Sequence, residues 1–507
     1  MPFRHSLKRI RSGHTPAGER MLAGGRTLAG GRTLAGGRNL SGKNILPVAV
    51  IGGGPVGLAA AAHLHAYQQP FVVLEAGREA GAAVREWGHV RTFSPWRYMI
   101  DGAAKNLLES SGWSSPDADH LPTGHELIDQ YVTPLSAHPA IRPHVRYNSR
   151  VTSVGRKDFD KVRTKGRDQQ PFEIRLESGE TIEARAVIDA SGTWRKPNPA
   201  GSGGVGAAGE NAHGDRIAYG IPDVAGRARA RYAGQRILVV GSGHSAFNVI
   251  LDLIALADEA PGTRILWAMR RDNLASVWGG GASDALEARG ELGQRTRRAV
   301  EAGRIRVLTP YRIRSIANNG NALSIAGVIG DDEVSVDADQ VIVCTGFRPD
   351  LEMLREVRLS LDPWLECPTA LGPLIDPNEH SCGTVRPHGA RELTHPETDF
   401  YVVGMKSYGR APTFLLATGY EQARSVVAML AGDVAAAERV ELVLPETGVC
   451  STDLAAAAGG CCGGPAPEEA NACCVDDAVA KAEGKSGCGC GTSEPVLLQI
   501  GVKGRVK

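Results

Sequence analysis

Two stretches of the chain show the same succession of apolar runs, glycine turns and helical spacing. A mostly apolar run at 45–51 leads into a glycine turn, an alanine-rich helical pattern follows to Tyr67, and a second apolar run covers Phe71 to Leu74. This order predicts a strand, a turn, a helix and a second strand.

The same succession recurs near the middle of the chain. Residues 236–240 predict a strand, a glycine turn follows, the apolar spacing from Ser245 to about Leu256 predicts a helix, and residues 264–268 predict another strand. Two such units predict an α/β protein with two parallel-sheet, Rossmann-like domains. The Pro-, Gly- and Ala-rich stretch 197–209, between the two units, and the glycine triplet 279–281, after the second unit, predict loops.

The two ends of the chain lack this periodicity. Residues 1–44 carry Met-Leu-Ala-Gly-Gly-Arg followed twice by Thr-Leu-Ala-Gly-Gly-Arg, and Glu19 is their only acid. The Gly-Gly pairs oppose a helix, so we expect a disordered basic extension, with a targeting or anion-binding arm as the alternative. After Leu444, Ala, Gly, Pro and Cys dominate, so we expect the folded body to end near residue 440 and a disordered tail to follow.

Charge and hydropathy narrow the choice of partners. The chain has 57 Lys and Arg against 56 Asp and Glu, a formal charge of +1. Such a balance provides no field to attract nucleic acid or an anionic membrane, so we expect a small-molecule substrate. No apolar run reaches the ~18 residues that a membrane span needs, and no secretory core precedes the first strand. We therefore expect a cytoplasmic protein, while the oligomeric state is left open.

The first glycine turn matches a dinucleotide-binding fingerprint. Gly52 permits a tight turn, Gly54 allows the backbone to approach a pyrophosphate, and Gly57 allows the helix to pack against the strand. Glu75 ends the second strand about 20 residues further on, where a carboxylate can accept hydrogen bonds from ribose hydroxyls. Strand, helix and acid together predict a nucleotide site; a ligand-free glycine turn with Glu75 as a surface charge is the alternative.

The second turn has the related pattern Gly241, Gly243 and Ala246, with Ser245 between the last two. Alanine in the last position is tolerated where helix meets strand. Here Arg270 and Arg271 follow the second strand, and guanidinium groups suit a ribose 2′-phosphate. We therefore expect NADPH rather than NADH; the alternative is that both arginines are solvated or paired with acids such as Asp272.

These features resemble the superfamily of flavoprotein monooxygenases and pyridine-nucleotide reductases, whose FAD domain is interrupted by an NADPH domain. The connectors of that superfamily end in Ala-Thr-Gly-like turns, and two similar segments occur here, at 189–194 and 344–349. The resemblance implies FAD and NADPH as cofactors, with Gly192, Thr345 and Gly346 near them. It implies an FAD domain at 45–224 and 335–440, an inserted NADPH domain at 225–334, an extension at 1–44 and a tail at 441–507.

Within the superfamily, residues 194–199 with their two prolines look most like the monooxygenase branch. Gly209 and His213 align with that branch's Phe-x-Gly-x-x-x-His fingerprint, while its aromatic position falls on Ala207. The disulfide-reductase branches need a cysteine pair near the first FAD helix or in the NADPH domain, and neither segment contains cysteine. A simple disulfide reductase is therefore disfavoured.

A narrower resemblance is to flavoproteins of bacterial arsenic-resistance operons. It rests on the segments 87–90, 93–96 and 406–410 and on a cysteine-rich tail. Vicinal thiols suit thiophilic metals or metalloids, and their spacing does not match a standard zinc site. The residues that we propose for a metal or metalloid are Cys461, Cys462, Cys473, Cys474, Cys488 and Cys490. An inert appendage is the alternative, and the vicinal C-terminal pair of mercuric reductases is a further likeness.

The function that these resemblances imply is an FAD-dependent, NADPH-reduced monooxygenase acting on a small soft nucleophile, in metalloid (arsenic) detoxification. One alternative is an NADPH-dependent reductase that passes electrons to the tail cysteines or a bound metalloid; another is a metalloid-binding or redox-sensing flavoprotein. No catalytic acid or base can be assigned without geometry. The polar side chains that we would examine, each of which also has a purely structural interpretation, are His213, Tyr219, Lys406, Tyr408 and Arg410.

Overall fold

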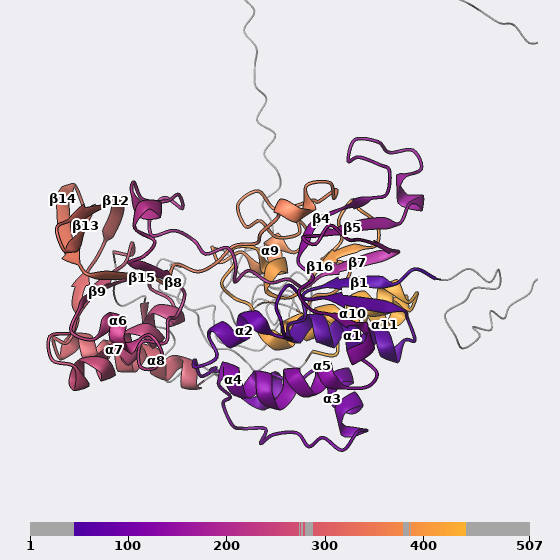
Figure 1. The fold of residues 1–507 in the computed structure, drawn as a ribbon, viewed down its shortest axis with the longest axis horizontal. Coiled ribbons are helices and arrows are strands. Elements are labelled where there is room, and N and C mark those ends of the chain that lie inside the picture. Colours follow the sequence, from indigo (N-terminus) through magenta and orange to yellow (C-terminus); the bar gives the residue numbers. More distant parts are fainter. Residues whose placement is uncertain are drawn as a thin grey trace, which may run out of the picture. The chain divides into compact units, whose positions relative to one another are not determined.

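The computed structural model describes residues 45–272, 274, 277–278, 287–378, 385 and 387–442 (Figure 1). The predicted extension at 1–44, the loop at 279–281 and the tail from residue 443 lie outside these residues. Among the helices of the described part, none combines the length and the apolar character that a bilayer crossing requires.

The first sheet holds five parallel strands in the order β16-β7-β1-β2-β3. Its strands are β1 (Val48–Ile51), β2 (Phe71–Leu74), β3 (Val145–Arg146), β7 (Ala186–Asp189) and β16 (Phe400–Val402).

Successive side chains of each strand point to opposite faces. Val48 and Val50 therefore face a helical layer, whereas Ala49 and Ile51 face an antiparallel sheet in the order β4-β5-β6. That small sheet consists of β4 (Val151–Arg156), β5 (Phe172–Leu176) and β6 (Thr181–Ala184). The helical side comprises α1 (Pro55–Ala66), α3 (Gly102–Glu109), α4 (Gly124–Leu127), α5 (Thr133–Ala137), α10 (Leu416–Leu430) and α11 (Val434–Glu438), with α2 (Ala82–Glu86) and α9 (Gly372–Ile375) in the loops.

The second sheet is also parallel and has the order β11-β10-β9-β15-β8. Its strands are β8 (Ile217–Tyr219), β9 (Arg236–Val240), β10 (Arg264–Ala268), β11 (Arg306–Leu308) and β15 (Gln340–Val343). Ile237 and Val239 face the helices α6 (Arg229–Tyr232), α7 (His244–Glu259) and α8 (Glu287–Glu301). Leu238 and Val240 face a second antiparallel sheet, made of β12 (Tyr311–Asn319), β13 (Ala322–Ile329) and β14 (Asp332–Ala338).

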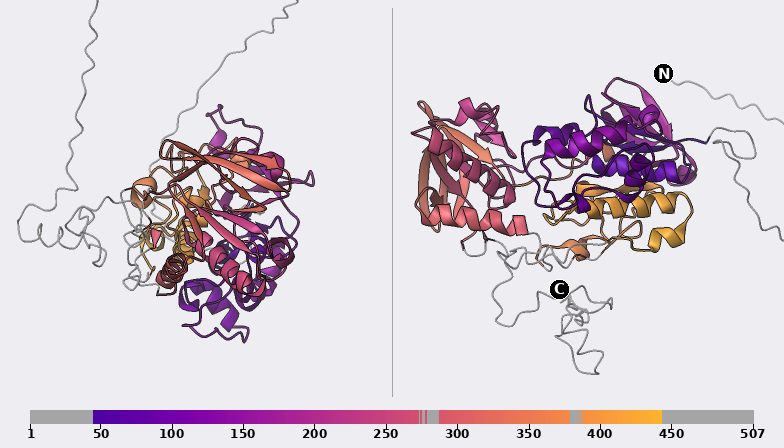
Figure 2. Two further views of the ribbon diagram at one scale, coloured as in Figure 1. Left: turned by 90° about the vertical axis from the view of Figure 1, so that its left-hand side faces the viewer. Right: turned by 90° about the horizontal axis from the view of Figure 1, so that it is seen from below.

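The two parallel sheets therefore have the same three layers, helices on one face and three antiparallel strands on the other, as the ribbons in Figures 1 and 2 show. The strands of the second sheet all lie between β7 and β16 in the sequence, so the second domain is inserted in the first. The predicted fold, two Rossmann-like domains with one inserted in the other, is confirmed.

Strands β8 and β15 lie outside the range 225–334 that the sequence indicated for the inserted domain. They pair with each other and with β9. Both are short apolar runs that precede or follow a connector, so the sequence pattern alone gave no sign of the sheet to which they belong.

Candidate functional site

The first glycine turn follows β1 and opens α1. Gly52 has φ +101°, and a Cβ atom there would lie 2.7 Å from the carbonyl oxygen of Ala190. A Cβ on Gly57 would lie 1.9 Å from the carbonyl oxygen of Gly52, so the helix approaches the turn as closely as glycine permits. Gly54 is the N-cap of α1 and makes no side-chain cap, so the amide groups of the first helical turn remain available to an anion.

Open space lies beyond Gly54, because a Cβ atom added there would meet nothing within 4 Å. Glu75 stands directly after β2 and is 9% exposed. Its carboxylate accepts hydrogen bonds from the backbone N–H of Gly53 at 2.7 Å and of Gly77 at 2.6 Å. Each carboxylate oxygen retains further acceptor capacity. The turn and Glu75 therefore fit the pyrophosphate and ribose of FAD.

Lys406 forms a buried ion pair with Asp189 beside this turn. Its Nζ lies 2.7 Å from Asp189 Oδ2 and 3.1 Å from Ser191 Oγ, and the side chains of Lys406 and Asp189 are 1% and 0% exposed. Ser191 also donates to Asp189 through its hydroxyl. The pair fixes the connector that follows β7, where Gly192 has φ +70° and open space in its Cβ direction.

The second turn repeats the geometry of the first. Gly241 has φ +126°, and a Cβ there would lie 2.3 Å from the carbonyl oxygen of Cys344, the residue after β15. Gly243 caps α7 without a side-chain hydrogen bond, and its Cβ direction is open. Ala246 is fully buried in the position of the third glycine, and Ser245 is half-buried. This turn also fits a dinucleotide.

Arg270 and Arg271 follow β10 at the carboxyl end of the second sheet. Arg270 is exposed and donates to the carbonyl oxygen of Ser202 at 2.8 Å. The backbone oxygen of Arg271 accepts a hydrogen bond from the Thr309 hydroxyl, and its side chain is half-buried. Both guanidinium groups belong to the strand end where a ribose 2′-phosphate is expected, so their role in NADPH preference stays a prediction.

The two connectors between the sheets are joined to each other. Thr345 Oγ1 donates to the carbonyl oxygen of Asn198 at 2.8 Å, and the Asn198 N–H donates to the carbonyl oxygen of Gly346 at 2.9 Å. Gly346 has φ +87°. The side-chain oxygen of Asn198 is buried without a hydrogen-bond partner in the described part of the chain. The Thr345 hydroxyl therefore holds the two connectors together, and the Asn198 side-chain oxygen beside it is free to accept a hydrogen bond.

Trp194 anchors the same region to α2. Its indole N–H donates to Glu86 Oε2 at 2.8 Å, and its ring lies against Phe347 with centroids 4.8 Å apart. Arg195 pairs with the other oxygen of Glu86 at 2.6 Å. Arg227 donates to the backbone oxygen of Glu86 at 2.6 Å. The sequence singled out the Trp194 segment but not Glu86, because its partners come from distant parts of the chain.

The remaining polar candidates are dispersed. The Tyr219 hydroxyl donates to Glu210 Oε1 at 2.7 Å, and burial together with this bond raises the pKa of Tyr219. Glu210 also accepts from the N–H groups of Ala200 and Ala207, so Tyr219 belongs to a loop-fixing network. His213, on the one-turn helix Glu210–His213, is half-buried.

Tyr408 and Arg410 lie near the end of the one-turn helix Gly404–Tyr408. Tyr408 is 1% exposed, packs edge-on against Phe414, and has a pKa raised by burial. Arg410 is exposed. Tyr408 therefore has a packing role, and in the described part of the chain it makes no hydrogen bond or ring contact with His213 or Tyr219.

The described part of the chain has few side chains that could bind a metal or act as reactive thiols. Its two cysteines, Cys344 and Cys367, are buried and free, and burial raises the pKa of both thiols, that of Cys367 to about 12. No group of three or more His, Cys, Asp or Glu side chains is placed there to hold a metal ion. The six tail cysteines proposed as metalloid ligands lie outside the described residues.

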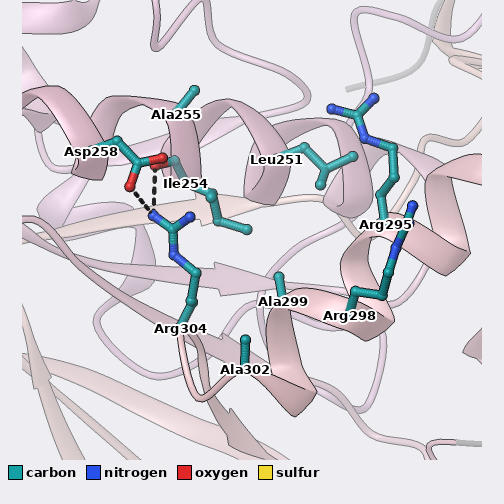
Figure 3. Close-up of a pocket in the computed structure, with 9 residues that line it drawn as sticks. All are labelled: Leu251, Ile254, Ala255, Asp258, Arg295, Arg298, Ala299, Ala302 and Arg304. Carbon is teal, nitrogen blue, oxygen red and sulfur yellow. Dashed lines mark hydrogen bonds and ion pairs between the residues drawn. The ribbon is translucent and has the colours of Figure 1, made fainter.

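Neither of two clefts found in the second domain is lined by the glycine turns. One, of about 440 Å³, lies between α7 and α8, where Arg304 pairs with Asp258 and donates to the carbonyl oxygen of Ile254 (Figure 3). The other, of about 990 Å³, is at the opposite end of the sheet from the second turn. Empty volume is therefore a poor guide to the nucleotide sites in this protein.

The structure has two dinucleotide-binding turns, one at the carboxyl end of each parallel sheet. This fold and these two sites are typical of a two-domain, nucleotide-dependent oxidoreductase. The pyridine nucleotide-disulphide oxidoreductase family matches residues 49–369, more than half of the chain. The chain belongs to this family, and it is an oxidoreductase with FAD and NADP(H) as cofactors.

Curated relatives are ferredoxin–NADP reductases. The protein of Thermus thermophilus is 25% identical over 343 residues, 67% of this chain and 84% of its own. That of Streptococcus pneumoniae is 23% identical over 62% of this chain and 78% of its own. That of Gluconacetobacter diazotrophicus is 33% identical over 187 residues, 36% of this chain, and the match spans 46% of its length.

Similar solved structures include enzymes with different reactions. The bacillithiol disulfide reductase Bdr of Bacillus cereus has a TM-score of 0.57 and 16% identity, covering 77% of this chain and 99% of that one. The cadaverine monooxygenase DfoA of Erwinia amylovora, bound to FAD, has a TM-score of 0.53 and 14% identity, covering 80% and 99%. These likenesses show the fold, and a fold shared by a reductase and a monooxygenase does not select a reaction.

Proposed function

We propose that this enzyme is a monooxygenase that takes electrons from NADPH through FAD to oxygen and oxygenates a small soft nucleophile, in the detoxification of arsenic or a related metalloid. The overall reaction balances as NADPH, a proton, oxygen and substrate giving NADP⁺, water and the oxygenated substrate. Bound FAD supplies the electron transfer and the oxygen chemistry. The protein binds both nucleotides at its two turns and orients them.

The observation that carries this proposal is the state of the cysteines in the described body. A disulfide reductase needs a reactive thiol pair next to its flavin, and a reactive thiol needs a lowered pKa and some exposure. Cys344 and Cys367 are buried with raised pKa values, and the Cys344 thiol lies 3.3 Å from the carbonyl oxygen of Gly220. Among the described residues there is thus no thiol pair to receive electrons, which favours an acceptor outside this part of the chain, and the acceptor that we propose is oxygen.

The metalloid part of the proposal rests on the tail sequence and on the resemblance to flavoproteins of arsenic-resistance operons. Seven cysteines follow residue 449, including two vicinal pairs. Such thiols bind soft ions. Replacing all seven by serine should abolish binding of arsenite to the full chain, as measured by equilibrium dialysis. A variant in which Cys344 and Cys367 are replaced instead should bind arsenite like the wild type.

The second candidate function is an NADPH-dependent reductase that passes electrons to a protein partner or to the tail thiols. The named activity of its curated relatives, ferredoxin–NADP reductase, favours this alternative. The body would then need neither a thiol pair nor an oxygen site, because the acceptor would come from elsewhere.

The test follows NADPH oxidation, oxygen uptake and hydrogen peroxide release together, with methylarsenite, with a simple thioether, or with no added substrate. A monooxygenase consumes one oxygen per NADPH, releases less peroxide when a substrate is added, and places ¹⁸O from labelled oxygen in the product. If the hydrogen peroxide released equals the NADPH consumed under all three conditions, and no product carries ¹⁸O, the enzyme does not transfer oxygen to these probes.

A further inference from the structure

The larger cleft of the second domain is lined by arginines at the amino-terminal ends of neighbouring strands. Arg236, Arg264 and Arg306 are the first residues of β9, β10 and β11. Arg304, just before β11, completes the set. The nucleotide turn follows β9 at its other end, and five residues of strand separate the two ends by about 13 Å. The cleft is therefore a different place from the NADPH site.

The sheet register places three of these arginines on one face. Arg264 pairs with Arg236 across β10 and β9, and Arg306 pairs with Leu266 across β11 and β10. Leu266 and Leu238 both pack toward the β12–β14 sheet. Since side chains alternate along a strand, Arg236, Arg264 and Arg306 point to this same face. Neighbouring strands are about 4.8 Å apart, so these three arginine positions lie close together at one end of the sheet.

Two of these arginines are not neutralised. Arg236 pairs with Asp339 at 2.7 Å, and Arg304 pairs with Asp258. Arg264 donates only to the carbonyl oxygen of Thr263, at 3.2 Å, and within the described part of the chain Arg306 has no hydrogen-bond or ion-pair partner. Like charges directly opposite each other on adjacent strands, as at Arg264 and Arg236, are destabilising. Arg306 lies diagonally across from Arg264, within reach of a long side chain, so one anion can be bound by both guanidinium groups.

The rest of the lining is polar and suits a small ligand. Asp337 is the single carboxylate among the lining residues, against four arginines. The hydroxyls of Ser324 and Ser335 lie 2.7 Å apart on the same wall, and Asn319 is held by Asp337 at 3.2 Å. The volume of about 990 Å³ falls within the range of small-molecule sites.

We propose that this cleft binds a phosphorylated small molecule with two linked phosphate groups, held by Arg264 and Arg306. Planar guanidinium groups bind phosphate oxygens in pairs of hydrogen bonds, which gives both charge and geometry to the site. The chemistry identifies a diphosphate group, as found in inorganic pyrophosphate or a nucleoside diphosphate, and the hydroxyl groups of the opposite wall are available to the remaining oxygens.

The test uses the full, FAD-loaded protein saturated with NADP⁺, so that both nucleotide turns are filled. Inorganic pyrophosphate is titrated by calorimetry into the wild type and into the double variant Arg264→Ala and Arg306→Ala. We expect one saturable site, weakened at least about tenfold in the double variant because two charge-assisted contacts are lost. The matched control is Arg295→Ala with Arg298→Ala, two exposed arginines of α8 that line the other cleft, and it should bind pyrophosphate like the wild type.

Thermal unfolding provides a second readout that does not depend on activity. Pyrophosphate should raise the melting temperature of the wild type and of the α8 control, but not of the cleft variant, by preferential binding to the folded state. Without ligand, the cleft variant should be at least as stable as the wild type, since Arg264 and Arg306 are exposed. Equal pyrophosphate affinity in wild type and cleft variant, or no binding to the wild type, would overturn the proposal.

Discussion

The ammonium group of Lys406 lies 2.7 Å from the carboxylate of Asp189, and both side chains are shielded from solvent. This pair connects the loop after β16 to the end of β7, next to the first glycine turn. Asp189 also accepts from the backbone N–H and hydroxyl of Ser191. A lysine that the sequence marked as a candidate for chemistry thus holds the connector on which Gly192 is placed.

Removing one member of this pair should be costly. Lys406→Met leaves the Asp189 charge buried without its partner, and we expect a loss of about 3–5 kcal/mol in the free energy of unfolding. Adding Asp189→Asn to it should recover part of the loss, because the uncompensated charge is gone. Denaturant unfolding of the two variants measures this, with Lys105→Ala, an exposed surface residue, as the control. Equal stability of Lys406→Met and wild type would contradict the role given to the pair.

Two glycines of the first turn should separate folding from cofactor binding. Gly57→Ala places a methyl group against the backbone of Gly52, so we expect a loss of about 2 kcal/mol or more in stability even without FAD. Gly54→Ala meets no protein atom, so the FAD-free protein should keep its stability. Its FAD affinity should fall at least about tenfold, because the methyl group enters the space where the pyrophosphate is expected. Thermal unfolding and FAD titration measure the two effects, and an unchanged FAD affinity in Gly54→Ala would place the cofactor elsewhere.

Arg270 and Arg271 should set the preference for NADPH. Charge-assisted hydrogen bonds contribute about 1.5–3 kcal/mol each. Replacing both residues by alanine should therefore lower kcat/KM for NADPH by at least about tenfold and leave kcat/KM for NADH nearly unchanged. Steady-state kinetics with both nucleotides measures this. A parallel loss with NADH and NADPH would mean that the arginines support the fold or the common part of the nucleotide.

His395 should make stability depend on pH. Burial lowers the pKa of His395 from 6.5 to about 4, while its ring accepts a hydrogen bond from the Ser360 N–H at 3.2 Å. The folded protein therefore favours neutral His395, and this contribution is complete above pH 6.5 and lost as the pH falls toward 4. The difference corresponds to about 3 kcal/mol.

The variant His395→Asn tests this pH dependence, because its amide oxygen can accept from the Ser360 N–H without titrating. Between pH 7 and pH 4, the unfolding free energy of the wild type should fall by about 3 kcal/mol more than that of the variant, because only the wild type loses the contribution of neutral His395. A constant difference over this range would show that His395 does not titrate as described.

The sequence predicted the parts of the fold that rest on local pattern. The run before Gly52, the helix after it and Glu75 follow from spacing within a short stretch, as do Gly241 and Gly243. The contacts that fix the geometry of these turns come from residues distant in the sequence. Gly52 meets Ala190, Gly241 meets Cys344, and such partners become visible only when parallel strands are placed side by side.

The candidate site was harder to predict because polar side chains have more than one use. Tyr219 and Lys406 were chosen as polar residues near the connectors, and the structure places both in hydrogen-bond networks, with Glu210 and Asp189. Glu86, which holds Trp194, and Asn198, whose oxygen is unused, gave no signal, since a single Glu or Asn carries no spacing pattern. The cleft with Arg264 and Arg306 also depends on strand register, which the sequence does not show.

The most direct test of the account is to follow where electrons go after NADPH has reduced the FAD-loaded enzyme. One equivalent of NADPH is added without oxygen, the FAD absorbance is monitored, and free thiols are counted before and after. The monooxygenase account predicts that FAD becomes reduced and stays reduced with no new thiols, and is reoxidised when oxygen is admitted. Reoxidation of FAD without oxygen, accompanied by two new thiols that are lost when the tail cysteines are replaced by serine, would contradict it.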